Sequence, residues 1–420
     1  MTEALEELEI VALDPHGSGV AANRVIVPFA LPGERTRVQA EGRRAEPVAI
    51  VTPSQERVEP FCPWFGRCGG CATQHMSARL YAGWKRGLVV GALKRASVPA
   101  EVGPLVDAHG AGRRRATFHA RFRHGGEDEV GFMRARSHDI VSIDACPLFA
   151  PAMAGAVPAA RALARDLSGL VKPLDIGVAA TLEGLDVDLR GSGPLALEET
   201  VKLIRTAEAL DLARLSNHGS TLVERRPPRV AFGETLVSLP AGAFLQATEA
   251  GEAWLAAFAE RAFAGARRVA DLFSGAGAFA LRLALRREVF AADADGAAIA
   301  ALKRAAAGAA GLKPLVAETR DLFRRPLAPA ELARFEGALL DPPRAGAEAQ
   351  AKAFAASEIP LVVAVSCNPA TFARDARILV EGGFAIEEAT PLDQFRHSPH
   401  VEIAAVFRRA KPRPRARRLL

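Results

Sequence analysis

The sequence predicts an α/β protein whose C-terminal half is a parallel sheet flanked by helices, preceded by a small β-barrel and a central α+β region. From about residue 229 onward, apolar strand-like runs alternate with Ala-rich helical runs, which is typical of a parallel sheet covered by helices. Residues 9–51 instead alternate apolar and polar side chains between Gly-rich breaks, a pattern that favours an antiparallel barrel. Residues 60–75 are irregular and rich in Cys and Gly, and residues 76–96 have helical spacing.

Length and composition indicate several domains. A chain of 420 residues with 49% hydrophobic content is long enough for two or three domains with cores of their own. We place the barrel at 1–55, the central region at 56–228, the α/β domain at 229–409 and a basic, disordered tail at 410–420. The Arg-Arg-Pro-Pro segment at 225–228 is typical of a linker and marks the last internal boundary.

Most of the positive charge lies at the C-terminus. The formal net charge is +6, but seven Lys and Arg side chains fall within residues 408–418, so the rest of the chain is close to −1. A basic surface on the body must therefore be local, and the run Arg113-Arg114-Arg115 is either part of one or a solvated face. No apolar stretch is long enough to cross a membrane and the first residues are acidic. We therefore expect a cytoplasmic monomer with no membrane partner.

Cys367 is the most informative single residue. It ends the apolar run 361–367 and is followed at once by Asn368-Pro369 and a segment of helical composition. The thiol should therefore lie at the carboxyl end of a buried strand, facing a helix N-terminus, whose dipole favours the thiolate. Pro in the first turn removes no hydrogen bond, because that N–H has no partner in a helix. An inert buried thiol is the alternative.

Acidic residues fall at four successive predicted strand ends, at Asp271, Asp293, Asp321 and Asp341. Because a carboxylate at the second strand end accepts hydrogen bonds from ribose hydroxyls, Asp293 suits a ribose, and Asp321 suits an adenine amino group. The Gly-x-Gly turn that contains Gly275 has no Lys or Arg to meet phosphate charge. A nucleoside carrying a sulfonium therefore fits this edge better than a polyphosphate. Each aspartate taken alone is equally typical of a helix N-cap.

Four cysteines form a second candidate site. Cys62, Cys68 and Cys71 are separated by five and two residues, and Cys146 comes much later in the chain. Metal ligation is favoured over disulfides in an intracellular chain. The spacing is not the paired Cys-x2-Cys of zinc ribbons, and Pro directly after two of the cysteines is typical of iron–sulfur loops. Together with the family resemblance described below, these features favour a 4Fe–4S cluster; structural zinc and scattered reduced thiols are the alternatives.

Several further segments repeat the motifs of a known family: Gly242-Ala-Phe-Leu-Gln246, Asp271-Leu-Phe-Ser-Gly-Ala-Gly277, Asp341-Pro-Pro-Arg-Ala-Gly346, Ser366-Cys-Asn-Pro-Ala-Thr-Phe-Ala-Arg-Asp375 and His400-Val-Glu402. With these segments the chain resembles the RNA uracil-C5 methyltransferases, which use S-adenosylmethionine and form 5-methyluridine. The four-cysteine pattern and the N-terminal barrel resemble the branch that methylates 23S ribosomal RNA. The chain departs from the family pattern at Thr248, Ser274, Ala278 and Asp293, which puts individual cofactor hydrogen bonds in doubt.

The resemblance implies three parts in chain order. An OB- or TRAM-like RNA-binding barrel comes first, a central iron–sulfur and RNA-binding region follows, and a Rossmann-like class I methyltransferase domain that depends on S-adenosylmethionine comes last. It implies a nucleophile, Cys367, that adds to C6 of uracil, and a base, Glu402, that removes the C5 proton. A solvent-facing Glu on an edge strand is the alternative for Glu402. The residues expected to bind the cofactor are Gln246, Phe273, Gly275, Asp293, Asp321 and Asp341.

Two other functions remain open from the sequence. A tRNA uridine methyltransferase would use the same chemistry, although the barrel and the four cysteines resemble the ribosomal branch. An RNA-binding iron–sulfur protein with a decayed catalytic domain would be expected to lose Cys367 or Glu402, and both are present. An amino-directed methylase would need an aromatic residue after Asp-Pro-Pro, where this chain has Arg344.

Overall fold

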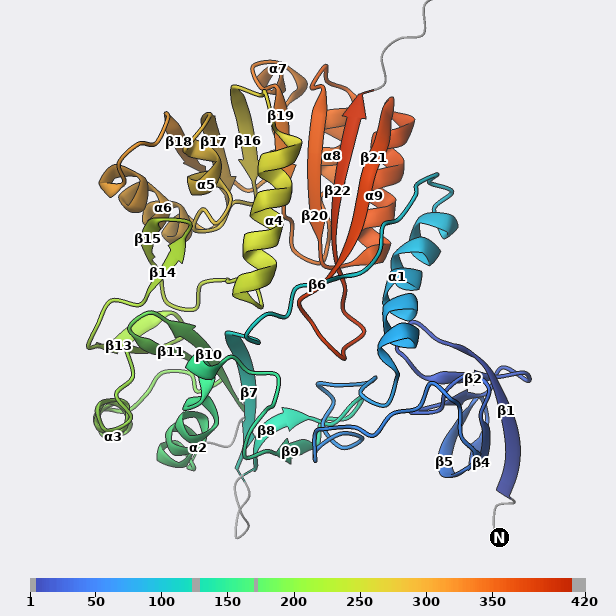
Figure 1. Ribbon diagram of the computed structural model, residues 1–420. Helices are drawn as coiled ribbons and strands as arrows, with labels where there is room; N and C mark the ends of the chain where they lie inside the picture. The colour runs from blue at the N-terminus through green and yellow to red at the C-terminus, as the bar shows by residue number, and fades with distance from the viewer. Residues whose placement is uncertain (1–4, 123–128, 170–172, 410–420) are drawn as a thin grey trace, which may run out of the picture.

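The computed structural model describes residues 5–122, 129–169 and 173–409, and the predicted basic tail lies outside them. Within these residues the chain forms a closed barrel, a seven-stranded sheet, a two-stranded hairpin and an eight-stranded sheet. In Figure 1 the barrel lies at the lower right, the seven-stranded sheet at the lower left and the eight-stranded sheet at the top. Among the described residues, no helix is both long and apolar enough to cross a membrane.

The N-terminal barrel closes because its first strand pairs with both β2 and β4, giving the order β1-β2-β3-β5-β4. Its small core is built around Ile10, Val27 and Val38, each almost completely buried. Gly19 permits a close approach, because a Cβ at this position would lie 2.8 Å from the Ala30 carbonyl oxygen. The strands are β1 (Leu5–Leu13), β2 (Gly19–Ala21), β3 (Ile26–Val27), β4 (Arg35–Glu41) and β5 (Arg44–Thr52).

The central seven-stranded sheet is antiparallel except for the β11–β12 pair and has the order β13-β12-β11-β10-β7-β8-β9. Leu174, Ile176 and Val178 alternate along β10 and pack with helices α2 and α3 into one core. The elements are β7 (Arg115–Arg121), β8 (Glu129–Met133), β9 (Ile140–Ser142), a 3₁₀ turn (Pro151–Met153), α2 (Ala156–Asp166), β10 (Leu174–Thr181), β11 (Gly184–Arg190), α3 (Leu197–Ala209), β12 (Arg214–Asn217) and β13 (Ser220–Glu224).

The eight-stranded sheet has the order β18-β17-β16-β19-β20-β22-β21-β6. The five strands from β18 to β20 run parallel, and β22 lies antiparallel between β20 and β21. A hairpin of β14 (Arg229–Phe232) and β15 (Thr235–Ser238) precedes it. The strands are β6 (Val106–Asp107), β16 (Arg268–Leu272), β17 (Glu288–Asp293), β18 (Leu315–Thr319), β19 (Gly337–Leu340), β20 (Leu361–Ser366), β21 (Phe384–Asp393) and β22 (Glu402–Arg409).

Helices cover both faces of this sheet, because its strands are apolar on both sides. Val363 on β20 faces the core that contains α4, α5 and α6, whereas its neighbours Val362 and Ala364 face the core that contains α1, α8 and α9. The helices are α1 (Ala78–Arg95), α4 (Glu249–Ala262), α5 (Ala280–Ala284), α6 (Gly296–Gly308), α7 (Pro329–Leu332), α8 (Glu348–Ala355) and α9 (Pro369–Glu381). The two-sided layering accounts for the nearly continuous apolar runs in the sequence.

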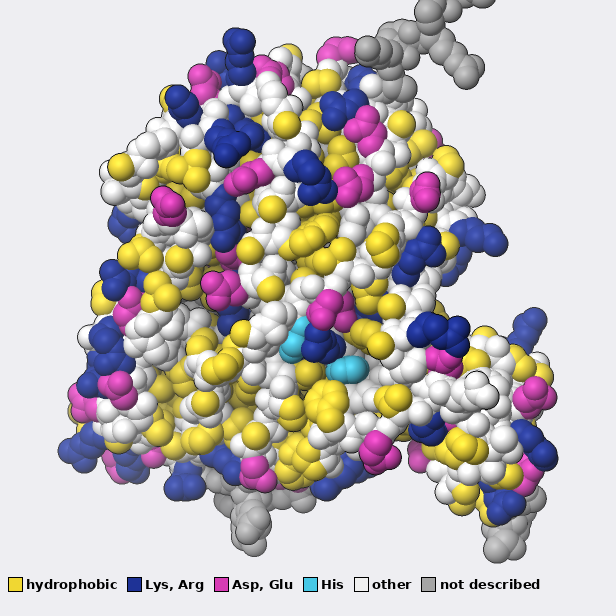
Figure 2. Space-filling view, viewed as in Figure 1, with side chains coloured by type: hydrophobic (Ala, Val, Ile, Leu, Met, Phe, Trp, Pro, Cys, Tyr) yellow, Lys and Arg dark blue, Asp and Glu magenta, His cyan; other side chains and the backbone are white. Residues whose placement is uncertain are grey.

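Residues 78–107, which we assigned to the central region, contribute to the large sheet. Helix α1 packs against α9, and β6 pairs in parallel with the end of β21 through Val106 and Leu392. The segment therefore crosses from the barrel to the far edge of the eight-stranded sheet before the chain enters the central sheet (Figure 1). In the space-filling view a notch separates the barrel from the sheet above it (Figure 2).

Candidate active site

The carboxyl ends of the parallel strands bring the predicted catalytic and cofactor residues to one edge of the sheet. Asp293 ends β17, Asp341 follows β19 directly, and Cys367 follows β20 directly. Asp271 lies one residue before the end of β16 and is completely buried, and burial raises the pKa of its carboxyl to about 7. The predicted strand-end residues therefore lie along one edge of the sheet, with β16 between β17 and β19.

Cys367 precedes α9 in the predicted arrangement. The Asn368 side chain caps the helix by accepting a hydrogen bond from the Ala370 N–H at 3.0 Å, and Pro369 occupies the first turn. The expectation that the helix N-terminus lowers the thiol pKa is not met. Burial raises the pKa of Cys367, and the nearby carboxylates of Glu402 and Asp341 raise it further. The cation that opposes them is Arg344.

Glu402 begins β22, and its side chain is buried, so the solvent-facing alternative is wrong. Burial raises the pKa of its carboxyl to about 7, against the lowering effects of a hydrogen bond from Gln394 and of the charges on Arg115 and Arg344. Asp341 lies close enough that the charge on Glu402 adds to the effect of burial, and the pKa of Asp341 is raised well above its usual value. The two carboxylates and the thiol therefore form one cluster in which burial raises the pKa of each group, and the charge of Glu402 raises the pKa of Asp341 and Cys367 further.

A continuous chain of hydrogen bonds joins the two carboxylates. Gln246 donates from Nε2 to Asp341 Oδ2 at 2.8 Å. Gln394 donates from Nε2 to Gln246 Oε1 and to Glu402 Oε2, both at 2.9 Å. The sequence analysis missed Gln394, which directly follows β21; the strand-end pattern that identified the aspartates would have found it, since β21 also ends at this edge.

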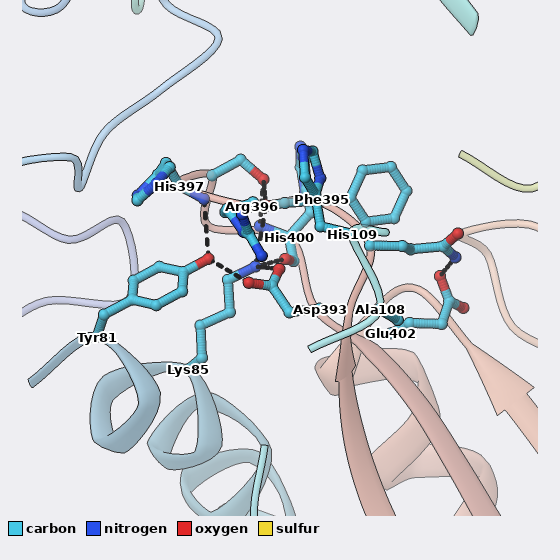
Figure 3. Close-up of polar contacts among 12 residues, drawn as sticks. Tyr81, Lys85, Ala108, His109, Asp393, Phe395, Arg396, His397, His400 and Glu402 are labelled. Atoms are coloured by element: carbon cyan, nitrogen blue, oxygen red, sulfur yellow. Dashed lines mark hydrogen bonds and ion pairs between the residues drawn. The ribbon is translucent and has the colours of Figure 1, made fainter. Parts of the chain in front are cut away.

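The loop between β21 and β22 is held by helix α1, as Figure 3 shows. Lys85 is completely buried, and its ammonium group donates to Asp393 Oδ1 at 2.6 Å, to the Phe395 carbonyl at 3.0 Å and to the His400 carbonyl. The Tyr81 hydroxyl donates to Asp393 Oδ2 at 2.6 Å. These contacts fix both ends of the loop that separates Gln394 from Glu402. They could not be predicted from local sequence patterns, because they join segments about 300 residues apart.

The arginine run at the start of the central sheet reaches inward. Arg114 donates to the Gln246 carbonyl at 3.1 Å and forms an ion pair with the buried Glu252. Arg115 interacts electrostatically with Glu402 and Cys367, and its guanidinium lies 4.7 Å from the centre of the Phe244 ring. The alternative of a solvated face for this run is therefore wrong.

The turn after β16 has the tight backbone that its glycines predict. The Phe273 N–H donates to the Ala292 carbonyl at 2.9 Å, and the Gly275 N–H donates to Asp293 Oδ2 at 2.9 Å. Phe273 has a φ of 64°, which is uncommon for a residue with a side chain. At Gly275, with a φ of 51°, a Cβ would point into open space, so the turn leaves room beside the backbone. Asp293 thus holds the turn in place.

Next to this turn the surface is partly apolar. The Phe273 and Phe323 rings lie 5.4 Å apart between centroids, and Phe323 is half exposed. Asp321 accepts hydrogen bonds from the Phe323 N–H at 2.9 Å and the Arg324 N–H at 3.3 Å. The Ser274 hydroxyl is buried, and no hydrogen-bond partner for it lies among the described residues. The turn therefore combines two apolar rings, tilted by 58° to each other, with polar groups available to a ligand.

The four predicted metal ligands meet at the junction of the Cys-rich loop and the central sheet. Cys62, Cys68, Cys71 and Cys146 are free thiols that line one cavity together with Arg113. Burial raises the pKa of Cys71 to about 12, against the effect of the Arg113 charge. In the described part of the chain, no three His, Cys, Asp or Glu side chains are arranged as a metal site. The structure therefore brings the four cysteines together without forming a closed ligand set.

Comparison with known proteins agrees with this geometry. The family model described as tRNA (Uracil-5-)-methyltransferase matches residues 242–410. An uncharacterized RNA methyltransferase of Brucella suis is 43% identical over 96% of this chain and 98% of its own length. The 23S rRNA (uracil(1939)-C(5))-methyltransferase RlmD of Chromohalobacter salexigens is 33% identical over 97% of this chain and 88% of its own length.

A solved structure extends the comparison to the whole fold. This structure is the Pyrococcus abyssi tRNA (uracil-54, C5)-methyltransferase in complex with S-adenosyl-L-homocysteine. The match covers 96% of this chain and 100% of the Pyrococcus chain, with a TM-score of 0.72 and 22% sequence identity. This likeness confirms the predicted class I methyltransferase fold, and the five-stranded barrel stands at its N-terminus as predicted. The full-length matches and the motifs at the sheet edge show that the chain belongs to the RNA uracil-C5 methyltransferase family.

Proposed function

We propose that this protein methylates C5 of a specific uridine in 23S rRNA, with S-adenosylmethionine as methyl donor, Cys367 as nucleophile and Glu402 as base. The observation that carries the proposal is the convergence of one thiol, two carboxylates of raised pKa and two arginines at one place on the sheet edge. We further propose that the enzyme acts as a cytoplasmic monomer and that the barrel and the exposed arginines of the central region, Arg134 and Arg136, contact the RNA.

The thiol supplies the activation that uracil lacks. C5 of uracil is a weak nucleophile, so Cys367 adds to C6, and the electron pair of the C5=C6 bond moves to C5 and the O4 enolate. Arg344 and Arg115 supply the positive charge that offsets the raised pKa of the buried thiol. The target uridine must be single-stranded or flipped out, because a base within a duplex cannot reach Cys367.

Glu402 completes the reaction. After C5 has accepted the methyl group it carries both methyl and hydrogen, and the ionised carboxylate of Glu402 takes that hydrogen as a proton. The C–H electron pair then restores the C5=C6 bond, the C6–S bond breaks, and its electron pair returns to the Cys367 sulfur. Because burial holds the pKa of Glu402 at about 7, the carboxylate is a stronger base than an exposed one and is still ionised above that pH.

The residues of the glycine turn fit the methyl donor. When bound, S-adenosylmethionine supplies an electrophilic methyl group on a sulfonium. The rings of Phe273 and Phe323 offer apolar surface for adenine, and Gly275 leaves the space that a side chain would fill. Asp293 has both oxygens fixed by backbone N–H groups at 2.8 and 2.9 Å, which orients its remaining lone pairs for ribose hydroxyls. Asp321 and Asp341 complete the proposed binding set, and Gln246, the remaining candidate for the cofactor, is assigned instead to the edge of the target base.

The four cysteines are proposed to hold a 4Fe–4S cluster. Their shared cavity and all-thiol donor set support this assignment, and Arg113 lies where it lowers the thiol pKa of Cys68 and Cys146. Structural zinc is the alternative metal, and uncoordinated reduced thiols are the second alternative. The proposed role of this region is to shape the RNA-binding part of the enzyme, and no chemical step depends on it.

The ribosomal substrate is favoured by the similarity to RlmD over nearly the whole chain. A tRNA substrate is the second candidate, because the matching family model carries a tRNA description. The two are separated by mapping 5-methyluridine in the rRNA and tRNA of a deletion strain. We expect one 23S rRNA position to lose the modification, and wild-type protein, but not Cys367→Ala, to restore it. Loss confined to tRNA supports the second candidate, and unchanged RNA contradicts both.

A further inference from the structure

We propose that Gln394 is a positioning residue that fixes the direction of the hydrogen bonds around the active site. It thereby decides which oxygen of Glu402 receives the C5 proton and presents Gln246 to the target base as a donor. The proposal rests on the proposed uracil-C5 methylation and adds to it a residue that determines base specificity.

The direction is set by a backbone group. The Ala247 N–H can only donate, and it lies 3.1 Å from Gln394 Oε1. Reversing the Gln394 amide would place two donors against each other in a completely buried position and leave both without an acceptor, which is unfavourable. Gln394 therefore keeps Oε1 toward Ala247 and Nε2 toward the active site.

Both hydrogens of that Nε2 group are used. One bonds Gln246 Oε1 and the other bonds Glu402 Oε2, each at 2.9 Å. Because the hydrogen bond from Gln394 stabilises negative charge on Glu402 Oε2, Oε1 is the more basic of the two oxygens and is the one that takes the C5 proton. Gln394 thus selects one of two otherwise equivalent carboxylate oxygens.

The same bond determines the orientation of the second amide. Because Gln246 Oε1 accepts from Gln394, its Nε2 must donate, and one hydrogen goes to Asp341 Oδ2 at 2.8 Å. The remaining N–H of Gln246 can donate only to an acceptor. A carbonyl oxygen of uracil satisfies it, whereas the amino group of cytosine at the same position would face it as a second donor. Gln394 therefore makes the site select uracil without touching the base.

The test uses Gln394→Met, which keeps the side-chain length but removes every polar contact, and Gln394→Glu, which keeps the acceptor for Ala247 but cannot donate when ionised. The control is Gln350→Met. Gln350 is equally buried, and its Oε1 accepts from the Leu327 N–H at 2.8 Å, away from the active site. Thermal melting of all three variants measures the structural cost of losing a buried amide.

Two readouts separate positioning from structure. We expect Gln394→Met to move the acidic limb of the pH–rate profile upward by about one unit, since a hydrogen bond to a carboxylate contributes about that much to its pKa. The other charged or ionisable groups facing Glu402 are Arg115, Arg344, Cys367 and Asp341, and they are unchanged. Gln394→Glu should shift the limb further, because a second carboxylate faces Glu402. Discrimination between uridine and cytidine at the target should fall at least about tenfold in both.

A pH–rate profile and a uridine preference that match Gln350→Met would overturn the proposal. Failure of the underlying function would look different, because wild-type protein would then form no 5-methyluridine. Titration of carbon-13-labelled glutamate side chains by NMR follows Glu402 without RNA, with Glu402→Gln identifying its signal. An unchanged Glu402 titration in both Gln394 variants contradicts the inference even if they are inactive for another reason.

Discussion

The protein contains two thiol sites that differ in their neighbours more than in the thiols themselves. Cys367 lies at the sheet edge, and Cys68, Cys71 and Cys146 lie in the cavity between the Cys-rich loop and the central sheet. All four are partly buried, and burial is the largest cause that raises the pKa of each thiol. A raised pKa therefore does not distinguish a nucleophile from a metal ligand in this fold.

The surrounding charges do distinguish the two sites. Cys367 is accompanied by carboxylates that can accept a proton and by Arg344, which stabilises a thiolate. In the second site each thiol has mainly other thiols near it, and Arg113 is the cation. One short run of sequence supplies a cation to each thiol site, since Arg113 faces the cysteine cavity while Arg115 faces Cys367 and Glu402. The comparison predicts that changes at one site should leave the chemistry of the other intact.

The largest effect is expected from Cys367→Ala. Without the thiol, no bond to C6 forms, and methyl transfer should fall by at least about 10⁴-fold, as for other removed nucleophiles. RNA carrying 5-fluorouridine at the target should trap wild-type protein in an adduct that survives denaturation, because the C5 fluorine cannot be removed as a proton. The variant should give no adduct. An adduct that persists in Cys367→Ala would assign the nucleophile to another residue.

Glu402→Gln should have the next largest effect. A neutral amide cannot take the C5 proton, so turnover should fall by about 10² to 10⁴-fold, while RNA binding and the bond to Cys367 remain. Incubation with unmodified RNA and labelled methyl donor, followed by a denaturing gel, should give label in a band of protein joined to RNA. Free methylated RNA released at the wild-type rate would place the base elsewhere.

The sequence predicted the sheet edge well because strand ends have a local pattern. Apolar runs that stop at a polar residue identified Asp293, Asp341 and Cys367, and parallel strands bring their carboxyl ends to the same edge without any further information. The buried state of Glu402 was predicted only with the family resemblance, because apolar neighbours on both sides are equally compatible with a solvent-facing Glu on an edge strand. The strand-end predictions needed only short-range information and the rule for parallel sheets.

The rest of the site depends on contacts between distant segments. Lys85 lies on a helix far from the catalytic motifs, and its complete burial follows from partners on the loop after β21. The helix-dipole argument for Cys367 considered α9 alone and omitted the carboxylates that β22 and the β19 loop bring close. Likewise, the side on which Arg113 and Arg115 project depends on how the central sheet docks. Local patterns contain none of this information.

The cysteine cavity should respond differently from Cys367. Protein purified without oxygen should be brown and contain about four irons per chain, as four thiolate ligands imply. Cys68→Ala should lose the colour and most of the iron, yet it should still form the 5-fluorouridine adduct, with methylation reduced by roughly tenfold or less, since this cavity supplies no reacting group. Stoichiometric zinc without iron would favour the alternative metal, and no metal at all would favour free thiols.

The smallest effect is expected from substituting Arg115 or Arg113, which lie two residues apart, and it best separates the two thiol sites. Arg115→Gln removes a charge that lowers the pKa of Glu402, so the acidic limb of the pH–rate profile should move above its expected value near 7 by a fraction of a unit. The sign follows from the base role: Glu402 works only when ionised, and a higher pKa leaves less carboxylate at a given pH.

Arg113→Gln is the matched control, because Arg113 lowers the thiol pKa of Cys68 and Cys146 instead. It should weaken iron retention and leave the pH–rate profile in place. Equal profiles for the two variants would mean that the thiol sites are not electrostatically separate.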